Sequence, residues 1–338
     1  MRIEESNEVR PLLEEGVDVH TPTVASTRPR HGRYSAPMTL EKFVYITESH
    51  HHVLPAWTDL RRQSDRAPRL LTFDHHKDTR SAFIAYSTRQ PRAEHRPWEA
   101  ITTERLRTID FRSDESIKAA VADLAWDEHI DAAVRLDVLD IAFVAAYDEV
   151  GHIESNEQLA LDAKRTLGGT EMRDGKLFVT LPGPPTIASP PFTYRIPASR
   201  IVTLPHALLP EELPEDQAYR AYFDAALESQ FLKQRLELIH EITRTSGEPG
   251  LFDRLFILDF DLDYFNTKQA IAPADTSMLD DLIPRAAFIT IARESSCVNS
   301  CQVKGEGLDS DFLEQELLKH IARATEAAGQ TMVVRRIE

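Results

Sequence analysis

The sequence predicts an α/β fold of three layers, in which helices cover both faces of a mainly parallel sheet. Short apolar runs alternate along most of the chain with segments of helical spacing, a pattern typical of parallel sheets buried on both faces. Acidic residues directly follow two of these runs, at 70–74 and 255–261. Ligand sites in such sheets lie at the carboxyl ends of the strands, so we expect a polar site there.

The first half of the chain supplies strands and helices in alternation after a polar beginning. Residues 1–37 are rich in Pro, Arg and Thr, and we expect them to form an irregular lead-in to a single domain at 38–338. Ser113 and Ser116 are both candidate caps for the second helix. The predicted strands are 43–47, 70–74, 82–86 and 141–147, and the predicted helices are 53–62 and 113–136.

Residues 150–250 interrupt this alternation and are predicted to be an insertion. They contain a hairpin that turns at Asp174 and Gly175, a proline-rich loop at 181–191, and a long amphipathic helix at 215–243 with Pro214 before its start. Such an insertion would form a groove for a peptide, or a stabilising or oligomeric contact. Beyond it, the sequence predicts strands at 255–261 and 288–292 and helices at 277–285 and 310–327.

Composition limits the classes of function. The net charge of −16 accords with ordinary solubility, makes nucleic acid a poor partner and would attract a cationic substrate. No run approaches the roughly 20 apolar residues that span a bilayer, and the first residues lack the apolar core of a signal peptide. Cys297 and Cys301 are too few for a disulfide framework. We expect a cytoplasmic protein without a membrane partner, and the sequence leaves its oligomeric state open.

The first acidic run, at 74–78, contains three candidate metal ligands at every second residue. In extended backbone, side chains two apart point to the same face, so Asp74, His76 and Asp78 are expected to converge, with His75 and Lys77 opposite. The alternative is a polar loop after a buried strand. Carboxylates and an imidazole meeting at a strand end are ligands for a divalent cation.

The second acidic run has the same period, with Asp259, Asp261 and Asp263. An EF-hand calcium loop would need Gly and Glu where Tyr264 and Ala270 stand, so that class is excluded. Capping of the following helix explains one aspartate but not three at period two. The run therefore predicts further metal ligands.

A histidine triplet, His50, His51 and His52, lies where an apolar strand meets a helix, and at most two of the three can face a common site. Four carboxylates with two neutral imidazoles would balance two divalent cations. Two such ions about 3.5–4 Å apart form a hydrolytic centre. A carboxylate-rich set without thiols favours Mn²⁺ over Zn²⁺.

These blocks resemble the ureohydrolase superfamily, which includes arginase, agmatinase and, more distantly, the histone deacetylases. The closer resemblance is to a divergent branch that contains peptide arginases, which convert arginine of ribosomally made precursor peptides to ornithine. Its pattern is acid-x-His-x-x-Val-Leu-Pro, Phe-Asp-x-His-x-Asp and Leu-Asp-(Ile/Phe)-Asp-Leu-Asp-Tyr-Phe, which stand here at 48–55, 73–78 and 258–265. The resemblance implies an arginase-like fold, two Mn²⁺ ions and an arginine-containing precursor peptide as partner.

The resemblance also implies the roles of individual residues. The six metal ligands would be His50 and Asp78 on one ion, His76 and Asp263 on the other, and Asp74 and Asp261 on both. In the alternative register, shifted by two, Asp259 and Asp261 are the ligands of the second run. In the first register Asp259 is a supporting carboxylate.

Two catalytic groups are expected beside the metals. A carboxylate after a later strand would hold the guanidinium, and Glu294 is the candidate, with an ordinary surface glutamate as the alternative. A histidine would relay a proton to the departing amine, and His129 or His95 is the candidate, although a structural histidine on a helix is the alternative.

One departure from the family pattern concerns the substrate. Arginases that act on free arginine carry an asparagine two residues after the last aspartate of the first run, and here that residue is Arg80. We therefore expect hydrolysis of peptidyl arginine to peptidyl ornithine and urea. The alternatives are a small guanidino or amide substrate on the same scaffold, and a non-catalytic binding protein stabilised by metal. Cys297 and Cys301 lack further zinc ligands near them in sequence and are interpreted as free thiols without a role.

Overall fold

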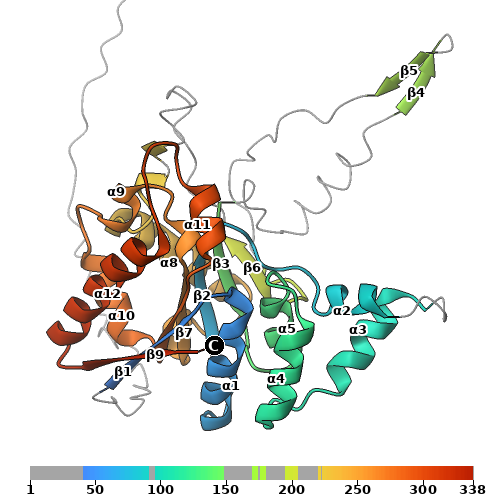
Figure 1. The fold of residues 1–338 in the computed structure, drawn as a ribbon, viewed down its shortest axis with the longest axis horizontal. Helices are drawn as coiled ribbons and strands as arrows, with labels where there is room; N and C mark the ends of the chain where they lie inside the picture. Colours follow the sequence, from blue (N-terminus) through green and yellow to red (C-terminus); the bar gives the residue numbers. More distant parts are fainter. Residues whose placement is uncertain are drawn as a thin grey trace, which may run out of the picture. The chain divides into compact units, whose positions relative to one another are not determined.

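A parallel sheet forms the centre of the computed structural model, which describes residues 41–90, 96–147, 170–173, 176–179, 195–204, 220–221 and 223–337. Within these residues, seven strands pair in the order β6-β3-β2-β7-β8-β1-β9, and every pairing is parallel (Figure 1). The strands are β1 (Glu41–Thr47), β2 (Arg69–Asp74), β3 (Ala142–Ala146), β6 (Ile201–Leu204), β7 (Phe256–Asp261), β8 (Phe288–Ala292) and β9 (Thr331–Arg336). The predicted α/β fold is confirmed.

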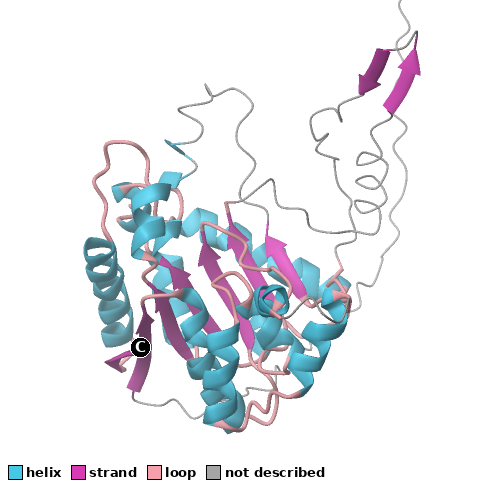
Figure 2. Ribbon diagram, turned by 45° about the vertical axis from the view of Figure 1, so that its right-hand side comes forward, coloured by secondary structure: helices cyan, strands magenta, loops and turns pink. Residues whose placement is uncertain are grey.

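Helices cover both faces of this sheet, as Figures 1 and 2 show. One hydrophobic cluster packs α8 (Ser229–Thr245), α10 (Ser277–Arg285) and α12 (Ser310–Ala327) against the sheet. The other packs α1 (Leu54–Gln63), α4 (Asp114–Asp123) and α5 (His129–Arg135) against the opposite face. Further helices in the described part of the chain are α2 (Ile84–Arg89), α3 (Trp98–Arg107), α9 (Lys268–Ile271), α11 (Ser295–Cys301) and the 3-10 turns η1 (His50–Val53), η3 (Leu251–Asp253) and η4 (Leu262–Tyr264).

Side-chain alternation along the central strands explains why the polar site forms on one side of the sheet. In β2, Leu71 and Phe73 pack in the cluster of α8, α10 and α12, whereas Leu70 packs in the cluster of α1, α4 and α5. Residues two apart in a strand share a face, so Thr72 and Asp74 lie on the α1 side with Leu70. The same alternation in β7 puts its aspartates on the α1 side.

The helix starts follow the capping residues of the sequence. The Ser113 side chain accepts a hydrogen bond from the Ser116 backbone N–H at 3.3 Å and caps α4. Asp309 accepts from the Phe312 N–H at 2.8 Å and caps α12. Each side chain satisfies one of the backbone donors that the first helical turn leaves unpaired.

Three predicted elements differ in the structure. Residues 82–86 were predicted as a strand, but Phe83, at a φ of 65°, precedes helix α2. The helix predicted at 113–136 divides into α4 and α5, because Leu124 is extended. The helix predicted at 215–243 is interrupted: residues 220–221 and 223–224 are helical, a turn at 225–227 and an extended Glu228 follow, and α8 begins at Ser229.

Two edge strands, β6 and β9, were not predicted: β6 has only four residues, and three of the six residues of β9 are polar. The predicted hairpin is present as β4 (Thr170–Arg173) paired antiparallel with β5 (Lys176–Val179). The predictions for residues 1–37, the turn at 174–175, the loop at 181–191, Pro214 and His95 lie outside the described residues.

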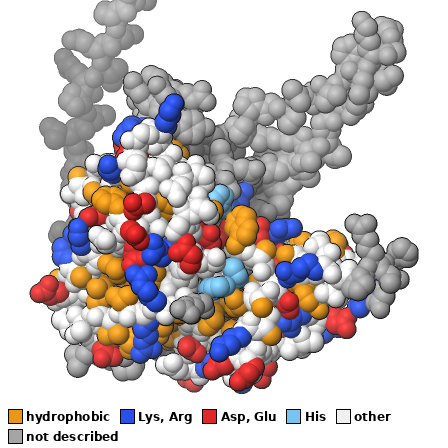
Figure 3. All heavy atoms as spheres, viewed as in Figure 1, with side chains coloured by type: hydrophobic (Ala, Val, Ile, Leu, Met, Phe, Trp, Pro, Cys, Tyr) orange, Lys and Arg blue, Asp and Glu red, His pale blue; other side chains and the backbone are white. Residues whose placement is uncertain are grey.

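The surface carries charges of both signs. On the face drawn in Figure 3, acidic and basic side chains are interspersed, with hydrophobic side chains between them. None of the described helices combines the length and the apolar character that would let it cross a membrane.

Candidate metal centre

The candidate site lies at the carboxyl ends of four neighbouring strands, β2, β7, β8 and β1. Asp74 is the last residue of β2, Asp261 is the last residue of β7, His50 begins the 3-10 turn after β1, and Glu294 follows β8. Because all four strands are parallel, their last residues meet at one edge of the sheet. Segments more than 200 residues apart in sequence therefore contribute to one site.

His50 is the centre of the first group of ligand atoms. Its Nδ1 lies 3.2 Å from Asp78 Oδ2, 3.2 Å from Asp261 Oδ2 and 3.4 Å from Asp74 Oδ2. The His50 side chain is fully buried, and the three carboxylates are at most 4% exposed. Since Asp78 has a left-handed φ of 47°, it reaches this group from the loop after β2 and not from an extended strand.

Asp259 fixes the orientation of His50 from the opposite side of the ring. Its Oδ2 lies 2.8 Å from His50 Nε2 and accepts the hydroxyl of Thr72 at 2.7 Å, while its Oδ1 accepts the hydroxyl of Thr290. Thr72, Asp259 and Thr290 are direct partners in the register of three adjacent strands. Asp259 thus supports His50 and lies outside the groups of candidate metal ligands in the described residues.

This orientation turns the Nδ1 side of His50 toward the three carboxylates. A carboxylate only accepts hydrogen bonds, so Nε2 carries the proton shared with Asp259. In neutral His50, the lone pair of Nδ1 then faces three carboxylates. In protonated His50, the one proton on Nδ1 is the only imidazole donor that faces the three carboxylates. A divalent cation among these atoms would accept the lone pair and neutralise the carboxylates.

A second group of ligand atoms consists of Asp74, His76 and Asp263, and it shares Asp74 with the first. His76 Nδ1 lies 3.1 Å from Asp263 Oδ2. Backbone N–H groups hold the carboxylates in place, because Asp74 Oδ1 accepts from His76 at 2.7 Å and Asp263 Oδ1 accepts from His75 at 3.2 Å. The His76 side chain is 30% exposed, so this group forms the open side of the centre.

The pKa values of the carboxyl groups reflect their crowding. Burial, and next the negative charge of Asp78, raise the pKa of Asp74 well above its ordinary value. Burial, and next the charge of Asp263, do the same for the pKa of Asp261. Burial lowers the pKa of His50, but attraction to Asp259 and hydrogen bonds to the surrounding carboxylates outweigh burial and raise it well above 6.5. Without cations, the centre therefore retains protons.

The donor set fits divalent cations. Asp74 Oδ2 and Asp78 Oδ1 are buried and have no hydrogen-bond partner among the described residues. Such orphaned oxygens are rare in folded proteins, and here they converge with His50 Nδ1. The buried cluster of His50, Asp74, Asp78 and Asp261 could hold a metal ion. All six predicted ligands belong to one or other of the two overlapping groups.

Glu294, the predicted guanidinium-binding residue, borders this cluster. Its Oε1 accepts the backbone N–H of His50 at 2.7 Å. It has a left-handed φ of 36° and lies at the start of α11. Burial raises the pKa of Glu294, and the hydrogen bond from the His50 backbone opposes that rise. Its second carboxylate oxygen, Oε2, lies 3.8 Å from the thiol of Cys297.

His129, the predicted proton relay, is also beside the cluster. Its Nδ1 lies 3.0 Å from the carbonyl oxygen of Trp126, which can only accept, so the Nδ1 carries the proton. Its Nε2 is buried and has no partner among the described residues. Its ring centroid lies 4.4 Å from that of His50. Burial, and next the charge of His50, lower the pKa of His129 well below 6.5, so its imidazole is neutral at pH 7.

Some residues that matter to the site could not be identified from the sequence. Thr72 and Thr290 orient Asp259, and the signal for them was a polar residue inside each of two apolar strands. Of the histidine triplet, only His50 belongs to a group of ligand atoms within the described residues, whereas His51 and His52 pack on each other, with ring centroids 4.4 Å apart.

The geometry stands without support from related sequences. A scan of the chain against protein-family models and a search of curated proteins gave no match.

Proposed function

We propose that the protein is a dinuclear manganese hydrolase that converts arginine side chains of a peptide to ornithine and releases urea. One observation carries this proposal: two groups of ligand atoms share Asp74, and Glu294 and His129 lie beside them. Shared carboxylates are the usual means by which two cations are held close together for hydrolysis.

The ligand assignment follows from the two groups and from the resemblance to the ureohydrolases. By that resemblance, His50 and Asp78 would hold one ion, His76 and Asp263 the other, and Asp74 and Asp261 would contribute to both. Asp74 belongs to both groups of ligand atoms, whereas Asp261 belongs only to the group that contains His50. Oxygen ligands predominate and imidazoles complete the set, so Mn²⁺ suits these residues. When bound, the two ions supply an activated water and neutralise the negative charge that develops during hydrolysis.

The residues of the chain would position the substrate and move one proton. The Glu294 carboxylate would pair with the guanidinium, and charge-assisted hydrogen bonds would orient the carbon to be attacked. The His129 Nε2, a neutral acceptor with a lowered pKa, would take a proton from the water and pass it to the departing side-chain nitrogen. The bond between the side-chain nitrogen and the guanidinium carbon breaks; water supplies the oxygen of urea, and its two hydrogens end on the side-chain nitrogen, one through His129, to give the ornithine ammonium.

Two features of the open side favour a peptide over free arginine. Arg80 replaces the asparagine that binds the α-groups of free arginine in the related enzymes, and its guanidinium lies 3.6 Å from Asp127. Trp126 is 48% exposed, and its ring centroid lies 6.0 Å from that of His76. An exposed indole next to the centre would contact the residues that flank the modified arginine.

The test is incubation of the protein with Mn²⁺ and arginine-containing peptides. We expect urea, a peptide mass lowered by CH₂N₂ for each arginine converted, and about two manganese per chain by metal analysis. Free arginine, agmatine and acetyl-lysine peptides in parallel reactions test the small-guanidino and amide alternatives. The matched control is Asp261→Asn, which should give neither product.

Absence of both urea and mass loss, with two metals bound, would refute the hydrolase and leave a metal-stabilised binding protein. If only agmatine or only acetyl-lysine peptides were hydrolysed, the proposed substrate would be wrong and the proposed metal centre would stand.

A further inference from the structure

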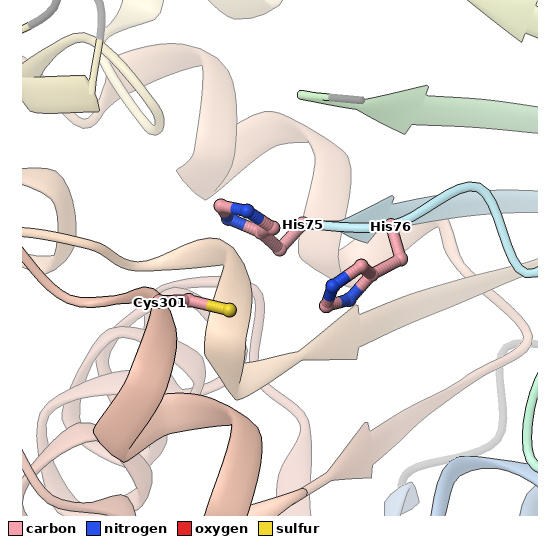
Figure 4. Close-up of side chains that lie close together, drawn as sticks. All are labelled: His75, His76 and Cys301. Carbon is pink, nitrogen blue, oxygen red and sulfur yellow. The ribbon is translucent and has the colours of Figure 1, made fainter. Parts of the chain in front are cut away.

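A further group of ligand atoms lies on the open side of the centre and differs in chemistry from the two groups that share Asp74. It consists of His75, His76 and Cys301, and their ligand atoms all lie within 4.8 Å of one another. Figure 4 shows the two imidazoles, from the loop after β2, and the thiol, from the last residue of α11, around a common space. All three residues are half-buried, so a dissolved ion can reach them.

Contacts to the turn after β7 bring these residues together. The η4 turn contacts α11, and within it Asp263 accepts the backbone N–H of His75 at 3.2 Å. The His75 ring is held from its other side, because Nδ1 lies 3.1 Å from Asn266 Oδ1. The Cys301 sulfur lies 4.0 Å from Asp263 Oδ2. Contacts to the η4 turn thus bring two adjacent imidazoles close to a thiol that lies more than 200 positions later in the sequence.

The donor types select a softer metal than manganese. Two imidazoles and a thiol form a three-ligand set of the kind that binds Zn²⁺ with a water in the fourth position. At Zn–N distances of about 2.0–2.1 Å and a Zn–S distance of about 2.3 Å, tetrahedral ligand atoms are about 3.3–3.6 Å apart. Because the ligand atoms lie within 4.8 Å of one another, side-chain movements that shorten these distances by up to about 1.5 Å would close the site.

We propose that His75, His76 and Cys301 bind one Zn²⁺ ion. His76 also belongs to the group with Asp74 and Asp263, so zinc on the thiol side competes with the second cation for this imidazole. Zinc binds such ligands more tightly than manganese does. If the proposed hydrolase function holds, on which this second statement rests, zinc inhibits the enzyme by withdrawing His76 from the dinuclear centre.

The first experiment detects the sulfur ligand directly, without turnover. Metal-free protein is titrated with Co²⁺, a spectroscopic substitute for Zn²⁺, and the sulfur-to-cobalt charge-transfer absorption is recorded. Wild type should show this absorption, and one equivalent of Zn²⁺ should remove it. Cys301→Ser and His75→Ala should lose it or bind cobalt at least about tenfold more weakly, since even loss of an outer-shell partner costs 10–100-fold in affinity.

Cys297→Ser is the matched control. This second thiol lies one turn earlier in α11 and outside the group. Its replacement should leave the absorption unchanged. Circular dichroism of each variant verifies that it folds. Absence of the absorption in wild type, or its persistence in Cys301→Ser, would overturn the proposal.

The second experiment measures zinc inhibition of urea release in the presence of manganese. Zinc inhibition is expressed relative to the zinc-free rate of each protein, and Cys301→Ser should require at least about tenfold more zinc than wild type for half-inhibition. Equal zinc sensitivity of the two proteins would overturn the competition. A failed hydrolase assay with an intact cobalt absorption would refute the proposed function and leave the zinc site standing.

Discussion

Replacement of Asp261 by asparagine separates the role of a metal ligand from that of a structural carboxylate. Asp261 is 3% exposed, its Oδ2 lies 3.2 Å from His50 Nδ1, and its Oδ1 accepts the backbone N–H of Asp263 at 3.2 Å. An asparagine has the same shape and its amide oxygen keeps this acceptor. The substitution therefore removes one buried negative charge and little else.

The expected magnitude follows from linkage. An ion present at 100 times its dissociation constant stabilises the folded protein by about 2.7 kcal/mol. The entropy of unfolding is about 2.1 cal/mol/K per residue, or about 0.6 kcal/mol/K for a domain of roughly 300 residues. Each ion therefore raises Tm by about 4 °C. Two ions give about 8 °C in wild type, and Asp261→Asn should keep about 4 °C or less.

The metal-free variant should behave in the opposite way. Two unit charges 4 Å apart repel by about 4 kcal/mol at an effective dielectric constant of 20, and Asp261 lies among several carboxylates. Its removal relieves part of this repulsion. We therefore expect Asp261→Asn to melt at or above the wild-type temperature in the presence of a chelator.

Differential scanning calorimetry, with chelator or with saturating Mn²⁺, measures both effects. Asp65→Asn, at an exposed site, is the matched control and should retain the full manganese-dependent rise. The reasoning is refuted if Asp261→Asn retains that rise, or if its metal-free form melts well below metal-free wild type.

Three further results are expected. Glu294→Gln should lower kcat/KM for an arginine peptide about 10–100-fold, because a charge-assisted hydrogen bond contributes about 1.5–3 kcal/mol. The manganese content should not change. A reduced manganese content would instead indicate that Glu294 is a metal ligand. His129→Asn should lower kcat about 10²–10⁴-fold while two manganese ions stay bound, and an unchanged kcat would exclude the relay. In chelated protein, the free energy of unfolding should fall between pH 6.5 and about 8. The pKa values of His50 and Asp74 are raised by folding, so the unfolded chain binds fewer protons in this window. The lowered pKa of His129 makes the free energy of unfolding depend on pH only below pH 6.5, and the lowered pKa of Lys42 does so only above about pH 8. Chemical denaturation at several pH values tests this, and saturating Mn²⁺ should abolish the fall.

The central strands could be predicted because their sequences are unambiguous. Residues 70–74 and 255–261 are apolar, bounded by polar segments and closed by aspartates, so strand, burial and site edge follow from one pattern. The run at 82–86 has five mostly apolar residues without alternation, which suits a helix as well as a strand. There the packing of α2 against α3 decided the outcome, and no local signal reports that contact.

The convergence of the first acidic run was predicted, but for an incomplete reason. Strand β2 ends at Asp74, so period-two alternation does not extend to His76 and Asp78. A loop brings them to the site, with Asp78 in left-handed backbone. For the same reason His75 does not point away from His76, and their ring centroids are 4.9 Å apart. The nearness of Cys301 to this loop depends on tertiary packing, which sequence spacing does not encode.

The difference between Asp259 and its neighbours explains why a cation belongs on one side of His50 and not on the other. Asp259 receives two hydroxyl donors and an imidazole donor, so its buried charge is already satisfied. Among the residues that the structure describes, no donor reaches one buried oxygen of Asp74 and one of Asp78. Burial of an unpaired carboxylate is costly, and the sequence could have avoided it with asparagine or threonine. The side of His50 that bears unsatisfied oxygens is therefore the side at which the cluster could hold a cation, whatever the substrate.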